Sequence, residues 1–201
     1  MQSFGIRTWM SGTVTAALLL TALPSWAGCP PTPREADLCR PFGQTALKSN
    51  ASGEFVWRAT RGDATSIEEF VDPDAAYQLC AWDEAKLVIA ADIPAAAECA
   101  DGSCWSERKD GGWRYADEPG ANGDIRQLDF IASDKSPTKI RADVTVIGGI
   151  ILPVTGDIIV QMLRTDTALC LESFAPADSY TIDDKDAFAA TFDVEDSPRQ
   201  K

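Results

Sequence analysis

The residues of this sequence with the clearest chemical potential are its six cysteines, all of which follow position 28. An even number of scattered thiols is typical of disulfides in an oxidising compartment, whereas a zinc site favours Cys-x-x-Cys pairs, which do not occur. Six cysteines allow many pairings, and the sequence does not choose among them. Proximity along the chain favours the disulfides Cys29–Cys39 and Cys99–Cys104, which leaves Cys80–Cys170 as the third pair.

The chain has no histidine among its 201 residues, which excludes Ser-His-Asp and Cys-His nucleophiles and any His-ligated metal site. Pairs of Asp and Glu could still catalyse glycoside hydrolysis, but the 31 acidic residues single out no pair. We therefore assign no catalytic residue, no metal site and no cofactor. A secreted hydrolase that depends on Asp or Glu is the lowest-ranked hypothesis.

Two acidic loops offer the oxygen ligands that Ca²⁺ prefers. One holds Asp72 and Asp74, and the other holds Asp183, Asp184 and Asp186. The Asp-x-Asp-x-Asp-Gly loop of dedicated calcium sites is absent, so solvated loops are the simpler interpretation. Calcium binding stays open.

Four aromatic side chains could form a platform for sugar rings, with acidic residues beside them. They are Trp82, Trp105, Trp113 and Tyr115. Aromatic residues at such positions also stabilise sheets by packing across strands and in the core. We favour the packing interpretation and keep carbohydrate binding as the alternative.

The hydrophobic pattern has a period of two, which predicts β-strands rather than helices. Over 55–60, Phe55, Trp57 and Ala59 alternate with Val56, Arg58 and Thr60. Apolar residues alternate with polar ones over 140–146, and candidate strands follow at 158–163, 169–174 and 188–194. Many short strands separated by turn residues predict an antiparallel β-sandwich, immunoglobulin-like or a related Greek key. An Asp110-Gly111 turn predicts a hairpin with Ser106 opposite Tyr115.

The first 27 residues resemble a secretory signal peptide, with Arg7 before an apolar stretch and Ser25-Trp26-Ala27 as a cleavage site. We expect a disulfide-pinned lead-in over 28–42, a single domain over 43–195 and a flexible tail over 196–201. No later stretch is apolar and long enough to cross a bilayer. Lipid anchoring through Cys29 is the minority alternative to a secreted or periplasmic protein.

The order of these motifs resembles an uncharacterised family of secreted bacterial all-β domains that are often repeated in large surface proteins. The resemblance is carried by Trp57–Thr65, Phe70–Pro73, Tyr77–Asp83, Ser103–Trp105 and Cys170. It implies an exported all-β domain in which Cys29 is a disulfide partner rather than a lipid site. It implies no activity, cofactor or catalytic residue. The second half of this chain is acidic where the family is rich in lysine.

The formal net charge is −13, from 18 Lys and Arg against 31 Asp and Glu. Nucleic acids and anionic membranes are bound through basic patches, so this balance argues against both as the main partner. We expect a non-catalytic structural or binding module outside the cytoplasm. Its partner would be a glycan or another surface protein.

Overall fold

The computed structural model describes residues 28–84, 86–109, 111–117, 120–133, 136–145 and 152–193. The predicted signal peptide over 1–27 and the predicted tail over 196–201 lie outside these residues. Strands dominate the described chain, which confirms the disulfide-stapled all-β class.

The first half of the chain contributes short helices at its turns and strands up to the hairpin near residue 110. Its elements are η1 (Ala36–Leu38), β1 (Arg40–Asn50), β2 (Glu54–Gly62), α1 (Ile67–Phe70), β3 (Tyr77–Asp83), β4 (Lys86–Ile93), β5 (Glu98–Cys99), β6 (Gly102–Ser103) and β7 (Trp105–Glu107). The second half continues with β8 (Trp113–Ala116), β9 (Ile125–Ser133), β10 (Ser136–Thr145), β11 (Ile158–Arg164), β12 (Cys170–Ala175), η2 (Ala177–Ser179), β13 (Tyr180–Asp183) and β14 (Ala187–Asp193).

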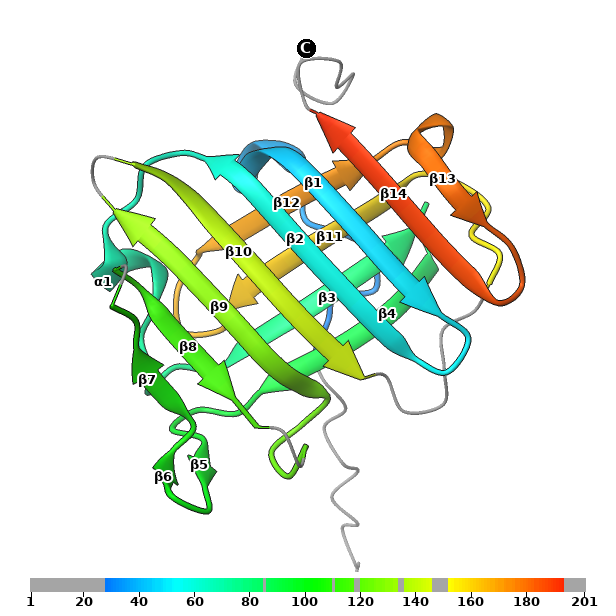
Figure 1. Ribbon diagram of the computed structural model, residues 1–201. Coiled ribbons are helices and arrows are strands. Elements are labelled where there is room, and N and C mark those ends of the chain that lie inside the picture. Colours follow the sequence, from blue (N-terminus) through cyan, green and yellow to red (C-terminus); the bar gives the residue numbers. More distant parts are fainter. Residues whose placement is uncertain are drawn as a thin grey trace, which may run out of the picture.

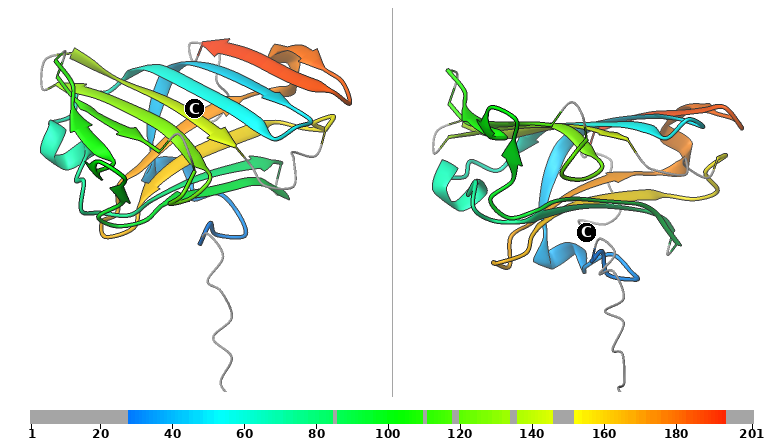
Figure 2. Two further views of the ribbon diagram at one scale, coloured as in Figure 1. Left: turned by 60° about the horizontal axis from the view of Figure 1, so that its bottom comes forward. Right: turned by 90° about the horizontal axis from the view of Figure 1, so that it is seen from below.

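Apart from the small β5–β6 hairpin, the strands form two layers that face each other (Figures 1 and 2). The small sheet has the order β4-β3-β11-β12, and the large sheet has the order β7-β8-β9-β10-β2-β1-β14-β13. Strand β1 joins the two, because Arg40 and Pro41 pair in parallel with β12 before the strand turns to pair with β2 and β14. All the other described strand pairs are antiparallel.

The main core lies between the two sheets, as the alternating pattern predicts. On β2, Phe55, Trp57 and Ala59 are buried, while Arg58 between them is exposed. The inward side chains of the large sheet continue across strands in register, so that Trp57 lies opposite Leu47 and Ala142. The outward side chains must follow the same register on the opposite face.

The β7–β8 hairpin differs by one residue from its predicted register. Trp105 pairs with Tyr115, whereas the two-residue turn placed Ser106 there. The prediction is wrong because the turn is wider: the Arg108 amide donates to the Gly112 carbonyl at 2.9 Å. The shift puts Trp105 and Tyr115 together on the core face and leaves Arg114 on the outer face.

Two of the three predicted disulfides are wrong. The bonds are Cys29–Cys80 and Cys39–Cys170, and only Cys99–Cys104 forms as expected from proximity. The lead-in therefore has no disulfide between its own two cysteines. It is tied at one end to β3 and at the other to the start of β12, and β1 begins at Arg40, inside the stretch expected to be lead-in.

The lead-in covers the outer face of the small sheet. The blue start of the described chain lies on the side of the small sheet that faces away from the large sheet (Figure 2). The Arg34 amide donates to the Gln161 side chain, and that side chain donates back to the Arg34 carbonyl, each at 3.0 Å. A second, smaller core forms beneath it around Cys80, Trp82 and Phe174. This explains why every residue of β11 and β12 is buried.

The sulfur of Cys29 is bonded to Cys80, so it cannot also carry a lipid through a thioether. Three disulfides are typical of proteins that fold outside the cytoplasm. Among the described residues, no helix is long and apolar enough to cross a membrane.

Candidate functional site

The predicted aromatic platform does not exist as an exposed surface. Trp82 and Tyr115 are fully buried, Trp105 is 5% exposed, and Trp113 alone is half-buried. Trp105 packs against Tyr115 in the main core with ring centroids 5.3 Å apart, whereas Trp82 lies in the second core beneath the lead-in. Trp82, Trp105 and Tyr115 are core side chains and Trp113 packs partly buried against the main core, so the four do not form one exposed site.

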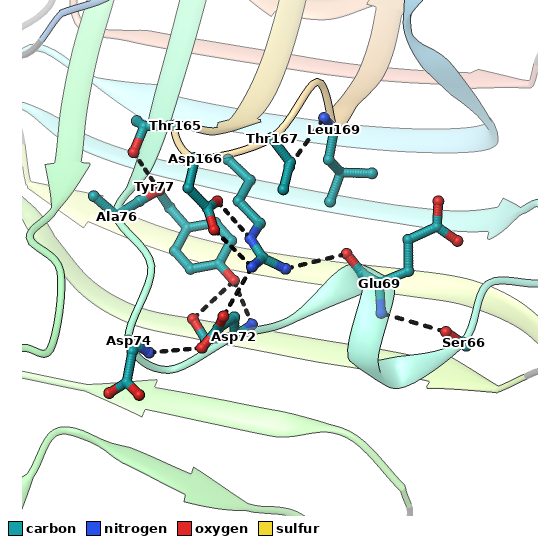
Figure 3. A network of polar contacts seen from close by, with 11 residues as sticks. Ser66, Glu69, Asp72, Asp74, Ala76, Tyr77, Thr165, Asp166, Thr167 and Leu169 are labelled. Atoms are coloured by element: carbon teal, nitrogen blue, oxygen red, sulfur yellow. Dashed lines mark hydrogen bonds and ion pairs between the residues drawn. The ribbon is translucent and has the colours of Figure 1, made fainter.

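The acidic loop at Asp72 is tied into an ion-pair network around a buried arginine (Figure 3). The Arg164 guanidinium donates to Asp72 at 2.9 Å and to both carboxylate oxygens of Asp166 at 2.7 and 2.8 Å. The Tyr77 hydroxyl accepts from the Asp72 amide and donates to the Asp72 carbonyl. The network links the α1 turn to the β11–β12 turn, and Asp72 in it is already paired with the Arg164 guanidinium.

The second acidic loop closes a turn. The Asp184 carboxylate accepts from the amides of Asp186 and Ala187, each at 2.8 Å. These hydrogen bonds hold the pKa of Asp184 below its usual value. In the part of the chain that the structure describes, no three His, Cys, Asp or Glu side chains are grouped to hold a metal ion.

The outer face of the large sheet carries a set of basic side chains that sequence reasoning did not assemble. One rung of directly paired residues crosses four strands. It consists of Arg114 on β8, Asp129 on β9, Arg141 on β10 and Arg58 on β2. The hairpin residues Arg108 and Lys109 lie beyond its β8 end, and Lys139 lies two residues from Arg141 on β10. We call these six cations the basic row: Arg58, Arg108, Lys109, Arg114, Lys139 and Arg141.

Asp129 anchors one half of the basic row. Its buried carboxylate accepts from Arg108 at 2.5 Å, from Arg114 at 2.7 Å and from Gln127 at 2.7 Å. Burial by itself would raise the pKa of Asp129, but the hydrogen bonds from Arg114, Gln127 and Arg108 hold it below the ordinary 3.8. The carboxylate therefore stays ionised and fixes two guanidinium groups in place.

Two surface hollows are lined by side chains of the basic row. One of about 300 Å³ is lined by Arg58, Thr60, Arg108, Arg114, Asp129, Ile131, Lys139, Ile140 and Arg141. The other, of about 310 Å³, is lined by Ser106, Glu107, Arg108, Lys109 and Arg114. Arg108 and Arg114 line both, so the two hollows lie side by side, and we refer to them together as the depression along the basic row.

Along the described part of the basic row, cations outnumber carboxylates. Among the described residues, three carboxylates lie beside its six cations: Asp129, Glu107 beside the hairpin, and Asp143, which accepts from Arg141 at 2.8 Å. Arg58, Lys109 and Lys139 form no ion pair with another described residue. A third of the chain's 18 basic residues thus gather on one face of a protein whose net charge is −13.

Comparisons with known proteins add no assignment: no family model, no curated protein and no solved structure matches the chain. The resemblance drawn from the sequence therefore stays a prediction. The signal that could have revealed the basic row was the outward position of Arg58 and Arg141 in their alternating strands. The sequence does not show that these two strands are neighbours.

Proposed function

We propose that this protein is an exported, non-catalytic binding module, and that the basic row holds an anionic ligand. Export is supported by the signal-like start of the sequence together with the three disulfides. The ligand class is supported by the charge on one face. The depression along the basic row offers guanidinium groups, which pair with carboxylate, sulfate or phosphate through two parallel hydrogen bonds.

The observation that carries the proposal is the direct cross-strand pairing of Arg58 with Arg141. Like charges opposite each other in a sheet are destabilising, and side chains so placed have Cβ atoms only about 5 Å apart. Asp143 offsets Arg141, but Arg58 has no carboxylate partner among the described residues. An anion bound between the two guanidiniums would turn this repulsion into two attractions.

Carbohydrate binding, the alternative function, would have to depend on charge rather than on aromatic stacking. Stacking of sugar rings on Trp82, Trp105 or Tyr115 is not supported, because these rings are buried. A glycan remains a suitable ligand where it carries acidic groups, since these would be recognised by charge.

The proposal is tested by retention on a sulfated polymer, immobilised heparin, with immobilised neutral dextran as the reference. We compare the wild-type chain with Arg58→Gln/Arg141→Gln and with Lys86→Gln/Lys185→Gln, which removes the same charge from exposed positions outside the basic row. We expect wild type and the Lys86/Lys185 variant to elute at similar salt concentrations, and the Arg58/Arg141 variant to elute earlier.

Equal elution of the two double variants would show that net charge alone governs retention, and it would overturn the proposal. Retention on dextran equal to that on heparin would overturn it as well, because charge would then play no part.

A further inference from the structure

The depression along the basic row has more than one place for an anion, and the geometry points to the kind of ligand. We infer that the ligand is a linear acidic polysaccharide, with carboxylate or sulfate groups along its length, that runs across the strands of the large sheet. This inference rests on the proposed function and specifies its ligand.

The length of the basic row is the first argument. The rung from Arg114 through Arg141 to Arg58 spans β8, β9, β10 and β2. Neighbouring strands are about 4.8 Å apart, so these cations extend over roughly 14 Å, and the hairpin residues Arg108 and Lys109 extend the depression further. A single carboxylate or phosphate between Arg58 and Arg141 would leave Lys109 and Lys139 without an anionic partner among the described residues.

The two halves of the basic row differ in their ion pairing. At the β8 end, Arg108 and Arg114 are fixed on Asp129, whose side chain is only 8% exposed. At the β2 end, Arg58 and Lys139 have no ion-pair partner among the described residues and remain available to successive anionic groups of one chain. Arg141 lies between the two ends and is held by Asp143 at 2.8 Å.

The groups between the cations suit sugar hydroxyls. Thr60 and Ser106 supply hydroxyls to the two hollows, and the Asp143 carboxylate beside Arg141 is 25% exposed. Carboxylates accept hydrogen bonds from hydroxyl groups but repel phosphates. A ligand that carries both acidic groups and hydroxyls matches this alternation better than a polymer of phosphodiesters does.

The surroundings of the basic row favour a polysaccharide over a nucleic acid or a membrane. Binding of single-stranded nucleic acid relies on aromatic side chains that stack on the bases, and the described lining of the two hollows contains none. Membrane attachment needs apolar anchors, and the large exposed hydrophobic side chains of the described chain, Leu38 and Ile182, belong to η1 and β13 rather than to the basic row.

The test is a length series of oligogalacturonates, from the monomer to the octamer, measured by calorimetry on the full mature protein at fixed ionic strength. Sulfated oligosaccharides of the same lengths form a second arm and tell which acidic group is preferred. We expect affinity to rise at least about tenfold between monomer and hexamer and then to level off, because linked groups bind at high effective concentration.

Variants at the two ends of the depression sharpen the result. Arg58→Gln and Lys109→Gln should each lower hexamer affinity by at least about threefold, as expected for the loss of one contact to an acidic group. Lys86→Gln on the small sheet should leave hexamer affinity unchanged. Circular dichroism of each variant shows whether its fold is intact.

The outcomes separate the two proposals. Equal affinity for monomer and hexamer would overturn the polysaccharide inference and leave a single-anion binding module. Tighter binding of single-stranded DNA or of phosphatidylglycerol vesicles than of either oligosaccharide series would overturn it in favour of those ligands. Failure of every anion to bind would overturn the proposed function as well.

Discussion

Arg58 on β2 lies directly opposite Arg141 on β10, with both side chains on the outer face of the large sheet. In a chain with 31 acidic residues, an acid at either position would have been a favourable cross-strand partner. The repulsion between the two guanidinium groups therefore lowers the stability of the sheet at this point. Such a loss is expected where a surface serves binding rather than stability.

Arg58→Gln should raise the stability of the protein. Removing one of two facing like charges is expected to add a few tenths to about 1 kcal/mol to the free energy of unfolding. Urea unfolding at low salt measures the change, and the gain should shrink as salt screens the repulsion. A loss of stability in Arg58→Gln, with Lys86→Gln unchanged, would show that Arg58 is held by interactions that outweigh the repulsion.

Asp129→Asn should destabilise the protein and loosen the β8 end of the basic row. The buried carboxylate accepts from Arg108, Arg114 and Gln127, and hydrogen bonds to a charged group are each worth about 1.5–3 kcal/mol. Because the pKa of Asp129 in the folded state is below the ordinary 3.8, its contribution is complete above that value and is lost as pH falls below it.

The pH dependence gives the check on Asp129. The difference in unfolding free energy between wild type and Asp129→Asn should be constant at neutral pH and shrink below about pH 4. A difference that stays constant down to pH 2 would contradict the role of the ionised carboxylate.

The local pattern of the sequence predicts which side chains within one strand are buried. It does not predict which strands, distant in sequence, lie next to each other. The alternation of Trp57 with Arg58 correctly separated core from surface, because a side-chain period of two follows from strand geometry alone. Proximity along the chain assigns Cys39 the wrong partner, because its true neighbour is set by two parallel residue pairs between β1 and β12, which no local signal encodes. The basic row was missed for the same reason, since its cations come from three strands and a hairpin.

The three disulfides should contribute unequally to stability. In the chain-entropy model, loops of 131, 51 and 5 residues give about 5, 4 and 2 kcal/mol for Cys39–Cys170, Cys29–Cys80 and Cys99–Cys104. Replacing each pair by alanines and measuring guanidinium unfolding should reproduce this order. Peptide mapping without reduction should recover the same three pairs, and a peptide joining residues 29 and 39 would contradict the structure.

The tyrosines should ionise only as the protein unfolds in alkali. Burial raises the pKa of Tyr77 from 10.0 to about 12, and burial also raises the pKa of Tyr115 and Tyr180 above 10.0. A raised folded-state pKa adds stability below pH 10 that is lost as pH rises toward 12. Phenolate absorbance and loss of near-ultraviolet circular dichroism should therefore rise together, and phenolate formation near pH 10 in a folded protein would contradict this.

Arg164 should be more important for stability than any exposed arginine. Its guanidinium is 8% exposed and bridges Asp72 and Asp166 from the β11–β12 turn to the α1 turn. Its loss would leave two carboxylates facing each other beside Tyr77. Because both carboxylates are partly exposed, we expect Arg164→Met to cost about 1–3 kcal/mol rather than the larger penalty of a fully buried pair.

The conservative substitution separates charge from geometry. Arg164→Lys keeps the positive charge but cannot donate to Asp72 and to both oxygens of Asp166 at once, so it should recover only part of the loss. Arg126→Lys, at an exposed position on β9, serves as the matched control and should change stability by less than about 0.5 kcal/mol. Full recovery by Arg164→Lys would mean that charge alone holds the two turns together, and that the forked geometry of the guanidinium contributes nothing.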